Sequence, residues 1–277
     1  MSENQLAIIA GGGSLSDVII ETARKKGWNV TVFAIGDLNI TKNQNISLIE
    51  MNRLDIGRIF QTLKSRKIKN ICMVGYIPRP NSLKDYLNLR YLNVQTLSVL
   101  FKSIGILRGG DASLFKKINS LLEKRGYKII GASEIAPNLT LKRGLYSSKS
   151  VSKVEFENIK KAKQCAEMTG YLDIGQAVIV KNGRVLAIEA AEGTDVMLER
   201  VTCLGRISTK RGGVILKSAQ INQDERVDMP TIGPNTIKNI VKANLSGIAI
   251  TADNVIVLDF QKVIEMIEDN NLYFIVI

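Results

Sequence analysis

Histidine is absent from the 277 residues of this sequence, and its absence removes several kinds of chemistry at once. Without imidazole there is no Ser-His-Asp or Cys-His catalytic centre, no HExxH zinc site and no histidine general base. Cys72, Cys165 and Cys203 lie far apart without a CxxC pair, which excludes a recognisable zinc knuckle or disulfide framework. A catalytic metal would therefore need oxygen ligands, which magnesium and manganese prefer.

Long apolar segments are also missing. No apolar run approaches the roughly 18 residues that a membrane span needs. Residues 1–13, MSENQLAIIAGGG, lack the basic start and the length of a secretory signal. Sparse, unpaired cysteines are typical of a reducing compartment. We therefore expect a cytoplasmic protein.

Acidic residues are few relative to basic ones: 38 Lys and Arg against 26 Asp and Glu give a net charge of +12. Residues 1–140 contain 20 basic and 10 acidic residues, so the excess is mainly N-terminal. A solvated, lysine-rich surface, an anionic membrane face and a phosphorylated ligand each explain it. Nucleic acid is disfavoured, because aromatics make up 5% of the chain and no stacking platform is recognisable.

The length and the pattern of apolar residues predict two domains. Apolar residues make up 45% of the chain and charged residues 23%, close to the globular average, and 277 residues exceed the usual size of one core. Strands alternate with helices in the first part, which predicts a Rossmann-like α/β domain with a parallel sheet over residues 1–135. The expected strands are 6–10, 28–35, 70–74 and 128–131, and the expected helices are 14–26, 56–63 and 114–124.

A polar, turn-rich segment, 136–150, is the expected linker to a mixed α+β domain over 151–277. That domain opens with a helix over 151–168. Asn182-Gly183 between two β-rich runs predicts a hairpin of strands 177–180 and 185–188. Further strands are expected at 214–217, 247–251 and 255–258, and a further helix at 236–244.

Three consecutive glycines, Gly11, Gly12 and Gly13, lie between the first expected strand and the first expected helix. Glycine lets the backbone come close to a ligand, and free N–H groups at a helix start favour a phosphate. Ser16 stands where the third glycine of GxGxxG belongs, and Asp37 follows at about the distance of a ribose-binding acid. A tight turn that binds nothing explains the same residues equally well.

Gly75 ends the third strand of this pattern and is followed by Tyr-Ile-Pro-Arg-Pro. In such a sheet the ends of the strands face the ligand crevice, so Arg79 is placed to meet a phosphate. A rigid surface turn is the alternative interpretation.

Acidic residues recur in the second domain, first at Asp173 and then at Glu189, Glu192 and Asp195. The last three are spaced three residues apart, so they share a broad face if the stretch is helical. Small residues between them would let a substrate approach closely. Alternatively, Glu192 and Asp195 are acids at the N-terminus of a helix that continues to Arg200.

The densest polar segment is 217–234, which follows an expected strand. Lys217 and Arg226 are suited to neutralise phosphate oxygens, and Asp224, Glu225 and Asp228 to bind a hard divalent ion. A metal ion can activate water and stabilise charge on phosphorus, so histidine is not required. A solvated loop with internal salt bridges is the alternative.

The segments AIIAGGGSL, Gly110-Asp111-Ala112-Ser113-Leu114, YLDIGQAVIVKNGRVLAIEAAEGTDVML and QDERVDMPTIGPNT, in this order, are similar to a known family. Together they resemble the UDP-2,3-diacylglucosamine pyrophosphatases of lipid A biosynthesis, of the type common in alphaproteobacteria. The likeness extends from residue 6 to about 259. The chain departs from the family pattern at Ala112, where a second acid often follows Asp111.

This resemblance implies a magnesium-dependent homodimer of two-domain chains. The family hydrolyses UDP-2,3-diacylglucosamine to UMP and 2,3-diacylglucosamine 1-phosphate (lipid X), with water attacking the phosphorus nearer the sugar. Its key aspartate corresponds to Asp228. An amphiphilic substrate and a basic N-terminal half further predict peripheral binding to the anionic inner face of the cytoplasmic membrane.

The expected site combines the resemblance with the motifs. Asp228 is the expected catalytic residue, and Mg²⁺ or Mn²⁺ is expected on Asp228, Asp195 and Glu192. The alternative function is a non-catalytic nucleotide- or lipid-headgroup-binding protein, and a nucleic-acid-binding protein is supported by charge alone. The expected substrate-binding residues are Gly12, Gly13, Gly75, Arg79, Thr194, Lys217, Gln223 and Arg226.

Overall fold

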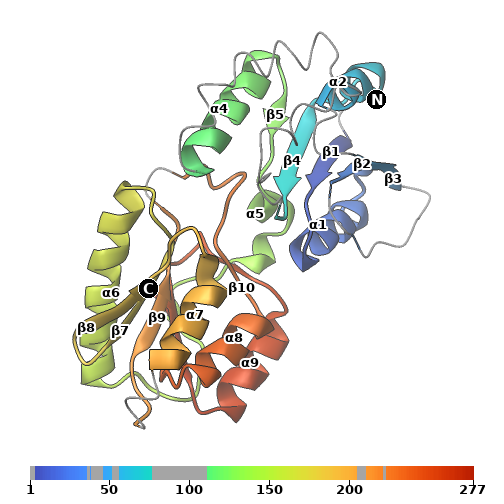
Figure 1. The fold of residues 1–277 in the computed structure, drawn as a ribbon. Coiled ribbons are helices and arrows are strands. Elements are labelled where there is room, and N and C mark those ends of the chain that lie inside the picture. The colour runs from blue at the N-terminus through green and yellow to red at the C-terminus, as the bar shows by residue number, and fades with distance from the viewer. Residues whose placement is uncertain are drawn as a thin grey trace. The chain divides into compact units, whose positions relative to one another are not determined.

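The structure is a computed structural model in which the described residues form two units (Figure 1). The first unit comprises described residues within 1–137 together with 226–228, and the second those within 138–225 and 229–277. The described residues are 4–35, 38, 46–51, 56–76, 111–204, 210–220 and 223–277.

The first unit is built on a parallel five-stranded sheet in the order β3-β2-β1-β4-β5. The strands are β1 (Gln5–Ala10), β2 (Asn29–Ala34), β3 (Ile46–Glu50), β4 (Asn70–Val74) and β5 (Lys128–Ile129). The helices are α1 (Ser14–Lys25), α2 (Ile56–Ser65), α4 (Asp111–Lys124) and the short α5 (Ala132–Ile135).

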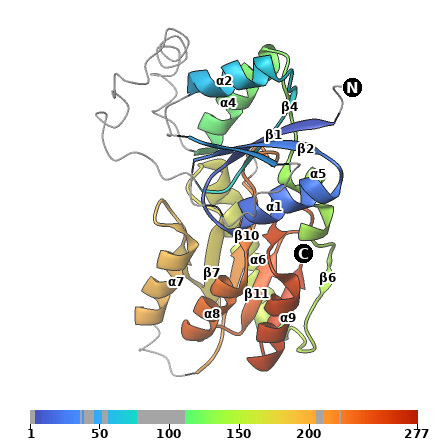
Figure 2. The ribbon, with the colours of Figure 1, turned by 90° about the vertical axis from the view of Figure 1, so that its right-hand side faces the viewer.

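Helices cover both faces of this sheet (Figure 2). On one face, Phe33 and Ile71 of the strands pack with Leu63 of α2 and Leu122 of α4. On the other lie α1 and α5, and α1 turns Ile19 and Ile20 into the interior. Apolar residues on both sides of each central strand are what a parallel sheet with crossover helices requires. The predicted Rossmann-like domain is confirmed.

The second unit contains a mixed six-stranded sheet in the order β6-β13-β11-β9-β7-β8. Its three central strands β13, β11 and β9 are parallel, and the strands outside them are antiparallel to their neighbours. The strands are β6 (Gly144–Leu145), β7 (Ala177–Lys181), β8 (Arg184–Ile188), β9 (Val214–Lys217), β11 (Gly247–Ile250) and β13 (Tyr273–Val276). A separate parallel pair joins β10 (Thr231–Ile232) to β12 (Ile256–Val257).

Four helices pack on this mixed sheet (Figure 1). One face carries α6 (Lys153–Tyr171), and the other carries α7 (Gly193–Leu204), α8 (Pro234–Lys242) and α9 (Phe260–Asp269). Along β9, Val214 and Leu216 pack in the cluster under α6, whereas Ile215 packs in the cluster under α7, α8 and α9. Because strand residues alternate between faces, the side chain of Lys217 lies on the α7 side.

Glu155 ties the N-terminal turn of α6 to β13 and to the residue that precedes β9. Its carboxylate accepts hydrogen bonds from the backbone N–H of Gly213 at 2.9 Å and from the Tyr273 hydroxyl at 3.3 Å. Burial, with the Glu155 charge and hydrogen bond adding to it, raises the pKa of the Tyr273 hydroxyl above its usual range. Asn158, one turn further, accepts from the N–H of Gly183 in the β7–β8 turn at 2.8 Å.

The mixed α+β character of the second domain and its hairpin are confirmed, with differences in detail. β7 and β8 pair antiparallel around Asn182-Gly183, as predicted. The expected strand 255–258 forms only β12, which pairs with β10 and not with the preceding β11. Within the expected linker 136–150, a 3₁₀ turn covers Pro137–Leu139, and β6 pairs with β13.

None of the helices among the described residues combines the length and the apolar character needed to cross a membrane.

Candidate functional site

The glycine turn after β1 is bound to the turn after β4. The N–H of Gly11 donates to Val74 O at 2.8 Å, and Gly12 and Tyr76 exchange two backbone hydrogen bonds of 2.9 and 3.0 Å. Ser16 lies in the first part of α1, and its buried hydroxyl donates to Gly11 O at 2.8 Å. The serine at the third glycine position of the motif therefore stabilises the turn.

The glycines of these two turns have different roles. Gly75 has φ +87°, and a Cβ there would overlap Ser16 Oγ and lie 2.8 Å from Gly11 O. At Gly13, by contrast, no atom lies within 4 Å of a Cβ position, and at Gly12 the nearest atom is 3.9 Å away. The structure explains Gly75 by close packing and Gly13 by its φ of +104°, which favours glycine, and the space beside Gly12 and Gly13 leaves room for a ligand.

The N-terminus of α1 begins at this open part of the turn. Gly13 is its N-cap residue and supplies no side-chain hydrogen bond to the helix. The first N–H groups of a helix attract anions, so the end of α1 is suited to a phosphate. Asp37 and Arg79, which were predicted to help here, lie outside the described residues.

A buried polar cluster lies where β9 ends in the second unit. Lys217 is only 8% exposed, and its Nζ donates to Thr194 Oγ1 at 2.8 Å and to Thr231 O at 3.1 Å. Thr194, at the start of α7, donates in turn to Glu189 Oε1 at 2.8 Å. Lys217 and Thr194 were both predicted as substrate-binding residues, and the structure brings them into direct contact.

Glu189 completes this cluster, although it was not among the predicted site residues. It is 9% exposed and follows β8 directly, with its N–H donating to Ala177 O at 2.9 Å. Gly175 packs against its backbone so closely that any Cβ there would overlap Glu189 O. In the sequence, the feature that could have indicated Glu189 is an acid at the end of an apolar strand, five residues before Thr194.

The acids Glu189, Glu192 and Asp195 do not share a helix face, so that expectation is wrong. Gly193 starts α7 with φ +82°, and both glutamates precede the helix. Glu192 pairs with Arg200 at 2.7 Å. For Asp195 the alternative interpretation is correct, because it is an acid in the first turn of α7.

Asp195 uses both carboxylate oxygens to connect α7 to α8. Oδ1 accepts a hydrogen bond from Asn239 at 2.9 Å and Oδ2 from Asn235 at 3.1 Å. Asp173, the other acid noted in the sequence, lies in a turn after α6 with φ 54°. The second-unit carboxylates noted in the sequence therefore have separate surroundings.

Residues 226–228 of the polar loop pack with the first unit. Arg226 Nη1 forms a 2.6 Å ion pair with Glu123 Oε1 of α4, and Val227 contacts the apolar cluster under α2 and α4. Asp228 is half-buried. The alternative of a loop held by its own salt bridges does not apply to Arg226, whose partner is 103 positions away in sequence.

The predicted ligands do not form a metal cage within either unit. Among the described residues, no three Asp, Glu or Cys side chains are grouped so that they could hold an ion. Asp228 belongs to the first unit, and Glu192 and Asp195 to the second. The set of Asp228, Asp195 and Glu192 as metal ligands therefore stays a prediction.

Gln223 lines a cavity of about 240 Å³ on the α6 side of the second unit. The side chain accepts a hydrogen bond from the N–H of Gln220 at 3.0 Å. Most of its other lining residues are polar; they are Lys163, Glu167, Ser218, Ala219, Gln220, Glu225, Thr251 and Asn254.

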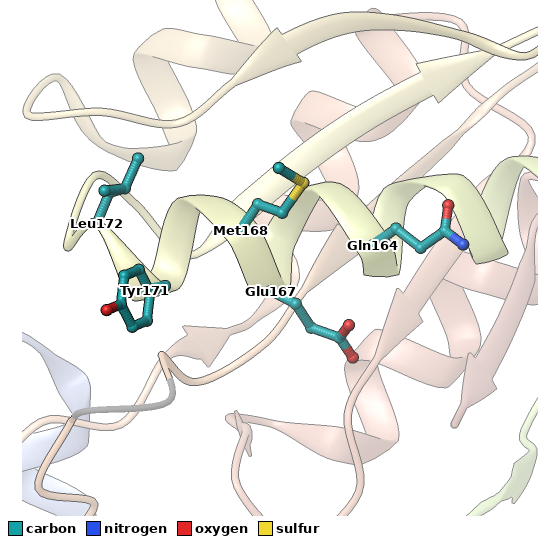
Figure 3. Close-up of a pocket in the computed structure, with 5 residues that line it drawn as sticks. All are labelled: Gln164, Glu167, Met168, Tyr171 and Leu172. Atoms are coloured by element: carbon teal, nitrogen blue, oxygen red, sulfur yellow. The ribbon is translucent and has the colours of Figure 1, made fainter.

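An apolar groove on α6 shares one lining residue, Glu167, with this cavity. Figure 3 shows the residues that line the groove. Met168, Tyr171 and Leu172 line the groove with Gln164, and 66–72% of each of these three side chains is exposed. A cavity with polar side chains in its lining, beside an apolar groove, is suited to a molecule with a polar head and apolar chains.

The structure does not support a role for the Cys72 thiol as a nucleophile. This cysteine is buried in β4, and burial raises the pKa of its thiol to about 12. A thiol with that pKa remains protonated near neutral pH and is a poor nucleophile.

Comparison with known proteins identifies relatives over the whole chain. The family model described as LpxI N-terminal domain matches residues 5–139, and that described as LpxI C-terminal domain matches residues 142–275. The chain is 34% identical over 274 residues to the UDP-2,3-diacylglucosamine pyrophosphatase LpxI of Caulobacter vibrioides, covering 97% of this chain and 96% of the relative. These matches confirm the resemblance read from the sequence motifs.

Among solved structures, a short chain dehydrogenase of Leptospira borgpetersenii with bound NAD⁺ is 12% identical, with a TM-score of 0.31. The alignment covers 87% of this chain and 78% of that one. A similarity at that level carries no argument about fold or ligand.

The two kinds of glycine give a testable difference in stability. We expect Gly75→Ala to lower the unfolding free energy of the first unit by about 3 kcal/mol, because the new Cβ meets backbone and the positive φ is strained. Gly12→Ala should change it by less than about 1 kcal/mol. Urea unfolding followed by the fluorescence of Trp28, the single tryptophan, measures both. Equal effects of the two substitutions would contradict the assignment.

Proposed function

The chain belongs to the LpxI family, and on that premise we propose that it hydrolyses the pyrophosphate of UDP-2,3-diacylglucosamine to UMP and 2,3-diacylglucosamine 1-phosphate. The observation that carries this proposal is the match to both LpxI domains together with 34% identity over 97% of the chain to a pyrophosphatase of that name. The reaction is a step in the synthesis of lipid A.

Features of each unit support such a substrate. In the first unit, the open glycines and the uncapped start of α1 are suited to a nucleotide phosphate. In the second, Lys217 supplies a buried cation, and the apolar groove on α6 shares Glu167 with a cavity that polar side chains line. A substrate with a nucleotide, a sugar and acyl chains requires polar and apolar surfaces of this kind.

The proposed chemistry is attack by water on the phosphorus nearer the sugar. The new P–O bond forms to the water oxygen, the bond from that phosphorus to the bridging oxygen breaks, and the bridging oxygen leaves with UMP. Asp228 orients the water and accepts its proton, since a carboxylate is the available base in a chain without histidine. Lys217 and Arg226, the latter oriented by Glu123, neutralise charge on the phosphate oxygens.

Asp228→Ala tests this assignment. We expect the variant to fold, to bind substrate within about tenfold of the wild type and to lose about 10² or more in turnover, because the lost interaction acts mainly in the transition state. Single-turnover UMP release and direct substrate binding are measured together. Asp269→Ala, an exposed acid at the end of α9, is the matched control.

A nearly wild-type rate for Asp228→Ala would make Asp228 structural and move the search to Asp173, Glu192 and Asp195. A wild-type chain that binds the substrate without releasing UMP would instead indicate a non-catalytic nucleotide- or lipid-headgroup-binding protein.

We also propose that the reaction requires Mg²⁺, with Mn²⁺ as a substitute. Magnesium is commonly held by one or two carboxylates together with substrate phosphates, so a preformed cage of three carboxylates is not needed. Asp228 is our candidate ligand, with Asp195 and Glu192 as the second-unit candidates. When bound, the ion would neutralise negative charge on the pyrophosphate.

Chelation tests the metal requirement. EDTA should abolish UMP release, and added Mg²⁺ should restore it, because the substrate then regains its counter-charge. Full activity in buffer stripped of divalent ions would show that the reaction needs none. Calcium-saturated EDTA is the control for effects of the chelator itself.

We further propose that the protein is a homodimer that works at the anionic inner face of the cytoplasmic membrane. The homodimer is what the resemblance to the family implies. Membrane binding is supported by the excess of 20 basic over 10 acidic residues in 1–140 and by the amphiphilic substrate. Binding of the purified protein to vesicles containing anionic lipid should weaken as NaCl rises from about 0.1 to about 1 M, because the Debye length falls from ~10 to ~3 Å. Vesicle binding that does not change with salt, or the absence of vesicle binding, would contradict the electrostatic part of this proposal. A monomer mass in sedimentation would contradict the dimer.

A further inference from the structure

We propose that Glu189 is a positioning residue for the reaction: acting through the Thr194 hydroxyl, it orients the ammonium group of Lys217 toward the pyrophosphate of the substrate. This inference rests on the proposed function and names a residue that the proposed chemistry does not use. It is carried by the hydrogen-bond chain from Lys217 to Thr194 to Glu189.

The direction of each hydrogen bond follows from donor and acceptor chemistry. An ammonium group can only donate, so Thr194 Oγ1 accepts from Lys217 at 2.8 Å. A hydroxyl has one hydrogen, and here it is given to Glu189 Oε1, also at 2.8 Å. Glu189 thus fixes the rotation of the Thr194 hydroxyl and turns its lone pairs toward Lys217.

Charge gives Glu189 a second role. Lys217 is 92% buried and Glu189 91% buried, which follows from their exposures of 8% and 9%. A buried ammonium is costly without a nearby negative charge. The carboxylate lies one hydroxyl away, so its negative charge contributes to compensating that of the ammonium group.

Three separate elements hold this chain of groups in place. Lys217 ends the central strand β9, and Thr194 lies in the first turn of α7. Glu189 is fixed by its backbone bond to Ala177 and by the close contact with Gly175. Groups held by rigid elements keep a narrow range of orientations, which a positioning role requires.

Oε2 of Glu189 is buried and has no hydrogen-bond partner among the described residues. Burial of an oxygen without a hydrogen-bond partner is costly, and the charge that Glu189 supplies near Lys217 and its hydrogen bond with Thr194 offset that cost. Glutamine has the same shape, but its amide can turn either its oxygen or its NH₂ group toward Thr194, so it no longer dictates where the hydroxyl hydrogen points. Glu189→Gln therefore removes the charge and keeps the packing, whereas Glu189→Ala removes both.

Kinetics of these variants test the proposal. We expect Glu189→Gln to lower kcat by about 10- to 100-fold with KM changed less than about threefold, since the orientation of Lys217 matters most in the transition state. Thr194→Ser should retain most activity because it keeps the hydroxyl, and Thr194→Val should lose as much as Glu189→Gln. Glu199→Gln, an exposed acid on the same helix α7, is the matched control and should behave as wild type.

A second readout does not depend on activity. In protein labelled with ¹⁵N-lysine, the buried Lys217 ammonium should give a slowly exchanging signal, assigned by its loss in Lys217→Arg. Glu189→Gln should speed its hydrogen exchange by about tenfold or more, while Thr194→Ser should preserve it. The exchange of the Lys217 signal can be measured even if the wild type proves inactive. Failure of the proposed function is therefore distinguished from failure of this inference.

Two results would overturn the inference. One is a Glu189→Gln variant with wild-type kcat and an unchanged Lys217 signal. The other is a loss expressed only in KM, which would make Glu189 a ground-state binding residue. If Glu189→Gln fails to fold, the contrast between Thr194→Ser and Thr194→Val decides, and equal activity of that pair would count against the proposal.

Discussion

The burial of Lys217 at the end of β9 is the constraint on which much of the second unit depends. A lysine ammonium in the interior needs hydrogen-bond acceptors and a compensating charge. Thr194, Thr231 and Glu189 supply them from α7, the start of β10 and the end of β8. The position of each of these elements is therefore linked to one cation, and that cation is the group we expect to meet the substrate phosphate.

Much of the fold was predictable because local patterns and burial agree. Buried apolar runs such as 6–10 and 70–74 form central strands, and Asn182-Gly183 forms the predicted hairpin turn. The periodicity of α9 was also available: Val263 and Ile267 are four residues apart and both buried, although no element was predicted after residue 258. The spacing of these apolar residues is sufficient to indicate the helix from the sequence.

The candidate site was less predictable, because its contacts join distant parts of the sequence. Arg226 pairs with Glu123, and Asp195 is held by asparagines of α8 about forty positions later. Spacing suggested a face of three acids, but the positive φ of Gly193 starts α7 only after Glu192. Lys217 and Thr194 were chosen from motifs, whereas the contact between them and Glu189 required the tertiary structure.

The most direct test of the account is ³¹P NMR of UDP-2,3-diacylglucosamine incubated with the purified chain and magnesium. If the chain is the pyrophosphatase that its family membership indicates, the two pyrophosphate resonances should be replaced by two phosphomonoester resonances, one from UMP and one from the acylated sugar 1-phosphate. Pyrophosphate resonances that persist with stoichiometric, folded protein would contradict the central claim.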